Sequence, residues 1–251
     1  MCSRRRADTL RALHQGDTPL VLPNAWDVPS ARSIEAAGFP AIATTSGGIA
    51  SAFGYPDGEV MPFELMFAAI ERIAGAVEVP VTPDVETGYG LALDELVERL
   101  LAAGAVGLNL EDTDRHGDQV LVPTEVHAAR VNGVRAAARA EGVDVVINAR
   151  VDVYARKVEP ALDVALERGR AYLEAGADCV YPILIRDEDH ITALVAALGT
   201  INVYWGRGWP TLARLAELGV RRISFGSGIQ RSTVAFVDDV VGRVRDGTYE
   251  G

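Results

Sequence analysis

A repeated unit of a helix-like stretch, a glycine and a short apolar run constrains this chain more than any other feature. Glycine ends helices well because it adopts left-handed backbone angles without a steric penalty. The apolar runs that follow do not alternate with polar residues, as expected of parallel strands buried on both faces. Two further apolar runs, 20–22 and 79–85, bring the predicted strands to eight. The glycines of the repeat are Gly38, Gly104, Gly142, Gly176, Gly199 and Gly219.

The spacing of these units predicts the fold class and the domain organisation. Eight strand–helix units in a chain of 251 residues match the usual size of a (β/α)8 barrel. We therefore predict an α/β protein with one TIM barrel domain over 1–251, and an active site at the C-terminal ends of its strands. A doubly wound open sheet is the alternative, although no G-x-G-x-x-G follows the first strand. The predicted helices cover 28–37, 62–76, 92–103, 124–141, 160–175, 188–198, 210–218 and 229–245.

Charge and cysteine usage limit the partners and the compartment. The formal net charge of −11 disfavours nucleic acid and anionic membranes as partners, because binding phosphates needs a basic face. Cys2 and Cys179 provide neither a disulfide framework nor zinc spacing, which fits a reducing cytoplasm. Residues 1–10 lack the apolar middle of a secretory signal, and their three arginines predict a frayed, solvated start. We expect a cytoplasmic protein with no nucleic-acid or membrane partner.

The stretch 81–90, VTPDVETGYG, carries the first candidate site. Side chains two apart on a strand share a face, so Asp84 and Glu86 are predicted to point the same way. Two ionised carboxylates so placed repel each other, and a divalent cation such as Mg²⁺ would remove that repulsion. A pair of solvated carboxylates at a strand end would give the same pattern.

The first two predicted strands end in further candidates. The small residues Ser46, Gly47 and Gly48 would allow backbone N–H groups to approach an anion closely. Asp57 lies in a Pro-Asp-Gly sequence, which a simple turn would also explain. Trp26 follows the first strand, where it either packs in the core or forms a wall of the substrate pocket.

The fourth and fifth strands bring a carboxylate and a guanidinium to the same rim. Glu111 ends the fourth strand, and the fifth ends in Arg150 and Asp152. An arginine there can clamp a carboxylate or phosphate through two parallel hydrogen bonds. It can equally form an internal salt bridge with Asp152 or Glu111, and the two roles are compatible.

Several of these motifs, taken in order, resemble the isocitrate lyase/phosphoenolpyruvate mutase superfamily. The resemblance covers residues 20 to about 180 and implies a (β/α)8 barrel, often a homo-oligomer with an exchanged C-terminal helix. It further implies Mg²⁺, with Mn²⁺ as a substitute, and a small anionic substrate, either a 2-oxo acid or an enolpyruvate-like molecule. The motifs are Ser46-Gly47-Gly48, Gly54-Tyr55-Pro56-Asp57, Asp84 to Gly90, Asn109 to Asp112, and Asn148 to Asp152.

The resemblance also implies roles for individual residues. Asp84 would bind the metal directly, whereas Asp57, Glu86 and Glu111 would hold metal-bound waters. Ser46, Gly47 and Gly48 would bind the substrate's carboxylate or oxyanion. Arg150 would clamp a second anionic group, and Asp57 could also take part in the chemistry.

The segment after the fourth strand differs from the segment that carries the proton donor in the lyases of that superfamily. Those lyases carry a Lys-(Lys/Arg)-Cys-Gly-His motif after the fourth strand, and its cysteine is the catalytic acid. Residues 113–118 of this chain read TDRHGD, with neither cysteine nor lysine. His116 becomes the candidate proton donor, because a histidine titrates near a working pH. An exposed loop histidine without a role is an equal alternative, and His14, His127 and His190 are expected at the surface.

Together these features predict a Mg²⁺-dependent carbon–carbon lyase or decarboxylase that acts on a small 2-oxo or hydroxy di-acid through an enolate. One alternative is a phosphonate-type mutase or hydrolase, in which Asp57 attacks or positions the transferred group. Another is a non-catalytic barrel that binds an anionic metabolite. A Schiff-base aldolase is disfavoured, since the chain's only lysine, Lys157, follows the fifth strand outside the barrel.

Overall fold

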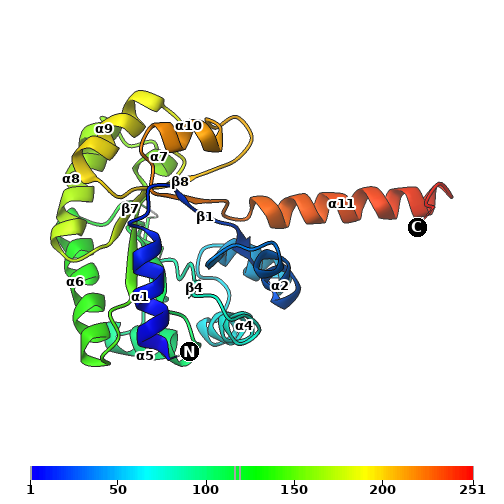
Figure 1. Cartoon of the computed structure of the whole chain (residues 1–251), viewed down its shortest axis with the longest axis horizontal. Coiled ribbons are helices and arrows are strands. Elements are labelled where there is room, and N and C mark those ends of the chain that lie inside the picture. The colour runs from blue at the N-terminus through cyan, green and yellow to red at the C-terminus, as the bar shows by residue number, and fades with distance from the viewer. Residues whose placement is uncertain (1, 116, 119, 251) are drawn as a thin grey trace.

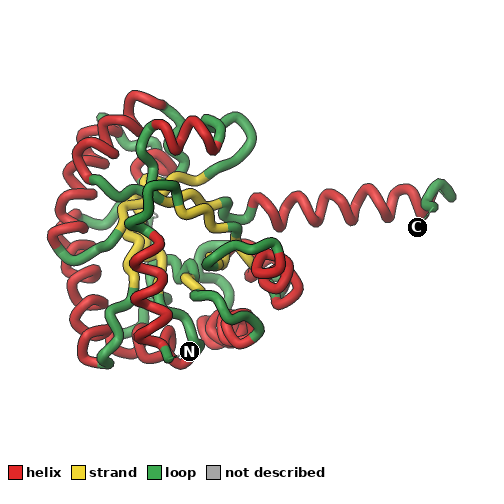
Figure 2. Tube along the Cα trace, viewed as in Figure 1, coloured by secondary structure: helices red, strands yellow, loops and turns green. Residues whose placement is uncertain are grey.

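The computed structural model describes residues 2–115, 117–118 and 120–250 as an α/β fold of short strands and covering helices (Figures 1 and 2). The strands are β1 Leu20–Leu22, β2 Asn24–Ala25, β3 Ile42–Thr44, β4 Val81–Thr82, β5 Gly107–Glu111, β6 Val146–Val151, β7 Cys179–Pro182, β8 Asn202–Tyr204 and β9 Arg222–Ser224. The helices are α1 Ser3–Leu13, α2 Val28–Ala36, α3 Ser46–Ala52, α4 Phe63–Gly75, α5 Leu93–Ala102, α6 Thr124–Ala140, α7 Val153–Arg156, α8 Ala161–Glu174, α9 Glu188–Leu198, α10 Leu212–Glu217 and α11 Gly228–Arg245.

The strands pair in parallel as three sheets of three, in the orders β1-β9-β8, β2-β3-β4 and β5-β6-β7. Isolated bridges join neighbouring sheets, from Asp84 to Asn109 and from Val180 to Ile201. The sequence predicted eight strands in one closed sheet, among them 20–22, which forms as predicted, and 79–85, which shortens to Val81–Thr82. Prolines explain part of the difference, because Pro23 separates β1 from β2 and Pro83 follows β4, and proline cannot donate a ladder hydrogen bond. Within each sheet, parallel pairing nevertheless brings the C-terminal ends of the strands to the same edge.

The eight predicted helices form with ends within two residues of the predicted ones. Each glycine of the repeat has a positive φ, for example +79° at Gly104, so it ends its helix as expected. On α5, Leu96, Val97 and Leu100 are buried, whereas Glu95 and Arg99 pair at the surface. Such apolar faces cover the buried strands and hold their ends in place.

The N-terminal segment corrects one expectation. It is not frayed, because α1 buries Ala7 and Leu10 completely. Arg11 donates to the backbone oxygen of Asp144 at 2.8 Å and forms an ion pair with Asp178. The sequence signal for this helix is the helical spacing of the apolar residues Ala7, Leu10 and Leu13.

Helix α11 extends away from the rest of the molecule and ends near the C-terminus (Figure 1). Gln230 is its buried residue. None of the helices within the described ranges is long and apolar enough to span a bilayer.

Candidate active site

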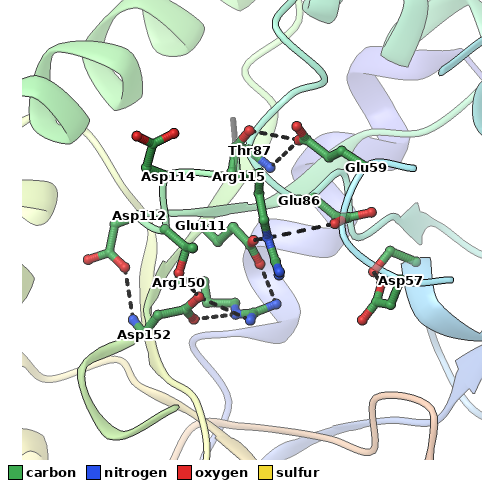
Figure 3. A network of polar contacts seen from close by, with 12 residues as sticks. Asp57, Glu59, Glu86, Thr87, Glu111, Asp112, Asp114, Arg115, Arg150 and Asp152 are labelled. Atoms are coloured by element: carbon green, nitrogen blue, oxygen red, sulfur yellow. Dashed lines mark hydrogen bonds and ion pairs between the residues drawn. The ribbon is translucent and has the colours of Figure 1, made fainter. Parts of the chain in front are cut away.

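Carboxylates from two loops and from the last residue of β5 meet at the ends of β4 and β5 (Figure 3). Asp84 follows β4, Glu111 ends β5, and Asp57 comes from the loop between α3 and α4. Ser46 Oγ lies 3.1 Å from Asp84 Oδ2 and 3.3 Å from Asp57 Oδ1, so its hydroxyl can donate to either carboxylate. The structure therefore brings together Ser46, Asp57 and Asp84, which lie up to 38 positions apart in the sequence.

Glu86 reaches this group by a route that strand periodicity did not predict. The strand ends at Thr82, and Glu86 lies in a turn with a φ of +52°. Its backbone N–H donates to Asp84 Oδ1 at 3.3 Å. The turn is held by Glu59, whose Oε1 accepts hydrogen bonds from the backbone N–H groups of Thr87 at 2.8 Å and Tyr89 at 2.9 Å. Glu59 was not predicted as a site residue, because its role depends on this tertiary contact.

The Glu86 carboxylate is buried with one oxygen unsatisfied. The residue is 2% exposed, and Oε1 accepts a hydrogen bond from the Tyr89 hydroxyl at 3.1 Å. Oε2 has no hydrogen-bond donor among the residues that the structure describes. A buried acceptor in this state is unfavourable unless a ligand, a water or an ion supplies the missing partner.

Burial and neighbouring acids shift Glu86, Glu111 and Asp84 toward their neutral forms. Burial, with the charges of Asp57, Asp84 and Glu111, raises the pKa of Glu86 to about 8. Burial raises the pKa of Glu111 to about 7, although Arg150 opposes the shift. The pKa of Asp84 is also raised, chiefly by burial. A cation among these side chains would stabilise their ionised forms.

Arg150 makes both of the salt bridges that the sequence allowed. Its Nη1 lies 2.5 Å from Glu111 Oε2, and its Nε donates to Asp152 Oδ1 at 2.6 Å. Burial alone would raise the pKa of Asp152, but the Arg150 charge and a hydrogen bond from Thr113 lower it overall. The guanidinium is thus fixed at the rim by two carboxylates, with its side chain 12% exposed.

A buried network behind this rim was not predicted. Asp112 Oδ2 accepts hydrogen bonds from Arg168 Nη1 at 2.9 Å and from the Tyr172 hydroxyl at 2.8 Å. Its Oδ1 accepts from the backbone N–H of Asp152 at 2.9 Å, which connects α8 to the end of β6. Arg168 and Tyr172 lie one helical turn apart, but nothing in their sequence indicates Asp112 as the shared partner.

Comparison with known proteins identifies the family. The family model for phosphoenolpyruvate phosphomutase matches residues 10–245. The chain belongs to the phosphoenolpyruvate mutase family. A crystal structure of a Burkholderia cenocepacia protein, provisionally named a phosphonomutase, is 40% identical with a TM-score of 0.89, covering 95% of this chain and 99% of that one.

Two relatives of this family member are named as enzymes that cleave carbon–carbon bonds. The 2-methylisocitrate lyase of Escherichia coli is 32% identical over 185 residues, 70% of this chain and 62% of the lyase. Oxaloacetate decarboxylase 2 of Pseudomonas fluorescens is 29% identical over 220 residues, 84% of this chain and 73% of the decarboxylase. The chain is accordingly an enzyme of the superfamily that contains these lyases and mutases.

In this family member, Ser46, Gly47 and Gly48 form the first turn of α3 rather than an open loop. The Gly48 N–H donates to the Thr45 side chain at 3.3 Å, so the helix cap already uses it. A Cβ on Gly47 would lie 3.0 Å from Asp57 Cγ and 3.1 Å from Ser227 Oγ. Glycine at 47 therefore allows the Asp57 loop to pack close to the helix.

Trp26 lies close to the first turn of α3, because a Cβ on Gly48 would be 3.2 Å from Trp26 Cβ. It packs on the core and lines a pocket of about 220 Å³ together with Phe53 and Arg72. A larger pocket of about 720 Å³ lies between the segment 204–211 and the start of α11, and Tyr204, Trp205 and Trp209 line it. None of the acids described above lines either pocket.

The burial of the histidines differs from the prediction. His116 falls outside the described residues, so its role as proton donor remains a prediction from the sequence. His14 and His127 were expected at the surface but are buried, with 5% and 0% exposure. Burial lowers the pKa of His127 to about 3, and its ring packs edge-on against Tyr172. His127 therefore stays neutral and belongs to the core.

Proposed function

We propose that this protein is a Mg²⁺-dependent enzyme that cleaves a carbon–carbon bond, or removes CO₂, from a small 2-oxo or hydroxy di-acid through an enolate. The observation that carries the proposal is the unsatisfied, buried Oε2 of Glu86 among like-charged neighbours. A buried group of this kind is unfavourable for folding alone, so we infer that a ligand supplies the missing positive charge.

The residues present fit a magnesium ion, and Mn²⁺ could replace it. Asp84 would ligate it, whereas Asp57, Glu86 and Glu111 would hold its waters. Within the described ranges, no three His, Cys, Asp or Glu side chains form a ready-made metal cluster. One direct carboxylate with water-mediated neighbours agrees with that arrangement, since Mg²⁺ usually keeps several waters. When bound, the ion would offset negative charge on the substrate's 2-oxo oxygen.

The chain's own residues would bind and orient the substrate. Arg150 would clamp a substrate carboxylate with guanidinium N–H groups, while Glu111 and Asp152 hold its planar head in place. The Ser46 hydroxyl, which contacts Asp57 and Asp84, would orient a substrate oxygen, and the N-terminal turn of α3 with Gly47 and Gly48 would allow close approach. Fixed groups of this kind lower the barrier by positioning the reacting atoms.

The position of Asp57 favours a second candidate function. Its side chain is exposed at the rim and touches the Ser46 hydroxyl, so it could attack or position a transferred phosphoryl group. Products separate the two reactions. Pyruvate or another 2-oxo acid with CO₂, an aldehyde or an acid supports the lyase, whereas inorganic phosphate or a rearranged phosphonate supports the mutase or hydrolase.

Metal binding tests the proposal directly. We expect calorimetry with Mg²⁺ or Mn²⁺ to show binding that Asp84→Ala abolishes and Glu86→Ala weakens less, since the first removes a ligand and the second a water contact. Glu95→Gln on α5 is the control, because that carboxylate is exposed and pairs with Arg99. Unchanged affinity in Asp84→Ala would rule out this metal site.

We further infer that the strands form a single (β/α)8 barrel. The three sheets and the two bridges join the strands in the cyclic order β1, β3, β4, β5, β6, β7, β8 and β9, with β2 continuing β1. A ring of this kind would place all of the strand ends around one mouth.

We also propose a homo-oligomer in which α11 packs on another copy of the chain. Its apolar side chains are exposed, including Phe236 at 64%, Val237 at 51% and Val241 at 59%. A row of exposed apolar residues on a projecting helix is unfavourable in a monomer. Light scattering should give a multiple of 26.7 kDa, and Phe236→Asp should shift the mass toward the monomer.

A further inference from the structure

Arg115 lies between Glu86 and Glu111, the two glutamates that we propose hold metal-bound waters (Figure 3). Its Nε forms a salt bridge with Glu111 Oε1 and lies 3.9 Å from Glu86 Oε2. The Arg115 side chain is 12% exposed, while those of Glu86 and Glu111 are 2% and 0% exposed. One guanidinium therefore faces two of the acids assigned to metal-bound water.

The contacts of Arg115 are unequal. The Glu111 contact is a hydrogen-bonded ion pair, whereas the Glu86 separation is too long for a hydrogen bond. Arg150, also cationic, already pairs with the other oxygen of Glu111. In the part of the chain that the structure describes, Glu111 thus has two cationic partners, whereas Glu86 has one cationic partner, Arg115, at 3.9 Å. Arg115 supplies the hydrogen bond at Glu111 Oε1, whereas Arg150 contributes an ion pair at Oε2, which has no hydrogen-bond donor among the described residues.

From this arrangement we infer that Arg115 is a built-in counter-cation that competes with the divalent ion for Glu86 and Glu111 and so sets the metal affinity of the site. The inference rests on the proposed metal site. The guanidinium stabilises the acids when no ion is bound. A hydrated divalent ion contacting the same oxygens would repel Arg115 and displace it from Glu86.

Neutralising the side chain tests the competition. Arg115→Gln removes the repulsion, so calorimetry should show Mg²⁺ binding tightened by about tenfold. Arg115→Lys keeps the positive charge and should stay within about threefold of the wild type. Without metal, Arg115→Gln should melt at a lower temperature than the wild type, and saturating Mg²⁺ should remove most of that difference.

Arg99 provides a matched control. It pairs with Glu95 four residues earlier, as Arg115 pairs with Glu111, but on the exposed surface of α5. Arg99→Gln should leave both the Mg²⁺ affinity and the Mg²⁺-dependent gain in melting temperature unchanged.

The outcomes separate this inference from the metal proposal. If Asp84→Ala abolishes binding while Arg115→Gln has wild-type or weaker affinity, Arg115 does not compete and the inference is overturned, although the metal site stands. If Asp84→Ala binds Mg²⁺ normally, the metal site itself is wrong and the inference fails with it.

A measurement on the wild-type protein covers the case in which Arg115→Gln does not fold. Phenylglyoxal modifies accessible arginines, and mass spectrometry locates the modified residue. Mg²⁺ should increase the modification of Arg115 and leave that of Arg99 unchanged. Unchanged or reduced modification of Arg115 would show that the guanidinium keeps its place when the ion binds, and would overturn the inference.

Discussion

Replacing Glu86 by glutamine should stabilise the metal-free protein at alkaline pH. Burial and like charges raise the pKa of Glu86 from 4.5 to about 8. Below pH 4.5 both the folded and the unfolded states carry the proton, so this group does not change stability. Between pH 4.5 and 8 the unfolded state releases the proton while the folded state retains it, so stability falls as pH rises. Above pH 8 the loss is complete.

The pKa difference sets the size of this effect. One pKa unit corresponds to 1.36 kcal/mol, so the rise of the Glu86 pKa from 4.5 to about 8 lowers the free energy of unfolding by roughly 5 kcal/mol at pH 8.5. Glutamine removes the charge but keeps an oxygen that can accept the hydrogen bond from the Tyr89 hydroxyl. Glu86→Gln should therefore match the wild type near pH 4.5 and exceed it increasingly up to pH 8.

Urea denaturation in EDTA, followed by tryptophan fluorescence at pH 5 and pH 8.5, measures this difference. Glu95→Gln on α5 should show no comparable change between the two pH values, because its exposed ion pair contributes little to stability. Mg²⁺ should stabilise the wild type at pH 8.5 more than Glu86→Gln. A stability difference between Glu86→Gln and the wild type that is equal at both pH values would refute the assignment of Glu86 as a destabilised acid.

Three further substitutions test the rim and its support. Arg150→Lys loses the planar fork, so calorimetry with oxalate, a planar dianion resembling an enolate, should show binding weaker by roughly 2–3 kcal/mol. Tyr172→Phe removes a donor to Asp112 and should cost about 1–3 kcal/mol, seen as a melting temperature lowered by a few degrees. If His116 donates a proton, His116→Gln should lower turnover by ~10²–10⁴-fold and abolish the fall in rate at high pH, with metal affinity unchanged.

The sequence predicted the helices better than the way the site is assembled. Glycines and apolar periodicity depend on local geometry, so the helix ends agreed closely. The position of Glu86 was derived from a strand that actually ends at Thr82. Its approach to Asp84 instead depends on a left-handed turn that Glu59 holds from another loop. Contacts between distant segments leave no period in the sequence, which is also why Asp112 and Tyr172 were missed.

Glu86 combines several features that are unfavourable in a folded protein, and this combination supports a ligand at the rim. Glu86 has a backbone conformation that residues other than glycine rarely adopt, a buried oxygen without a hydrogen bond, and a pKa raised by neighbouring acids. Folding alone would favour a small polar residue or glycine at this position, since each of these features lowers stability. The same features favour binding of a cation, which supplies the missing partner and relieves the repulsion. An unfavourable residue thus lies where a positive ligand would stabilise it, and Arg115, at 3.9 Å, relieves only part of that strain.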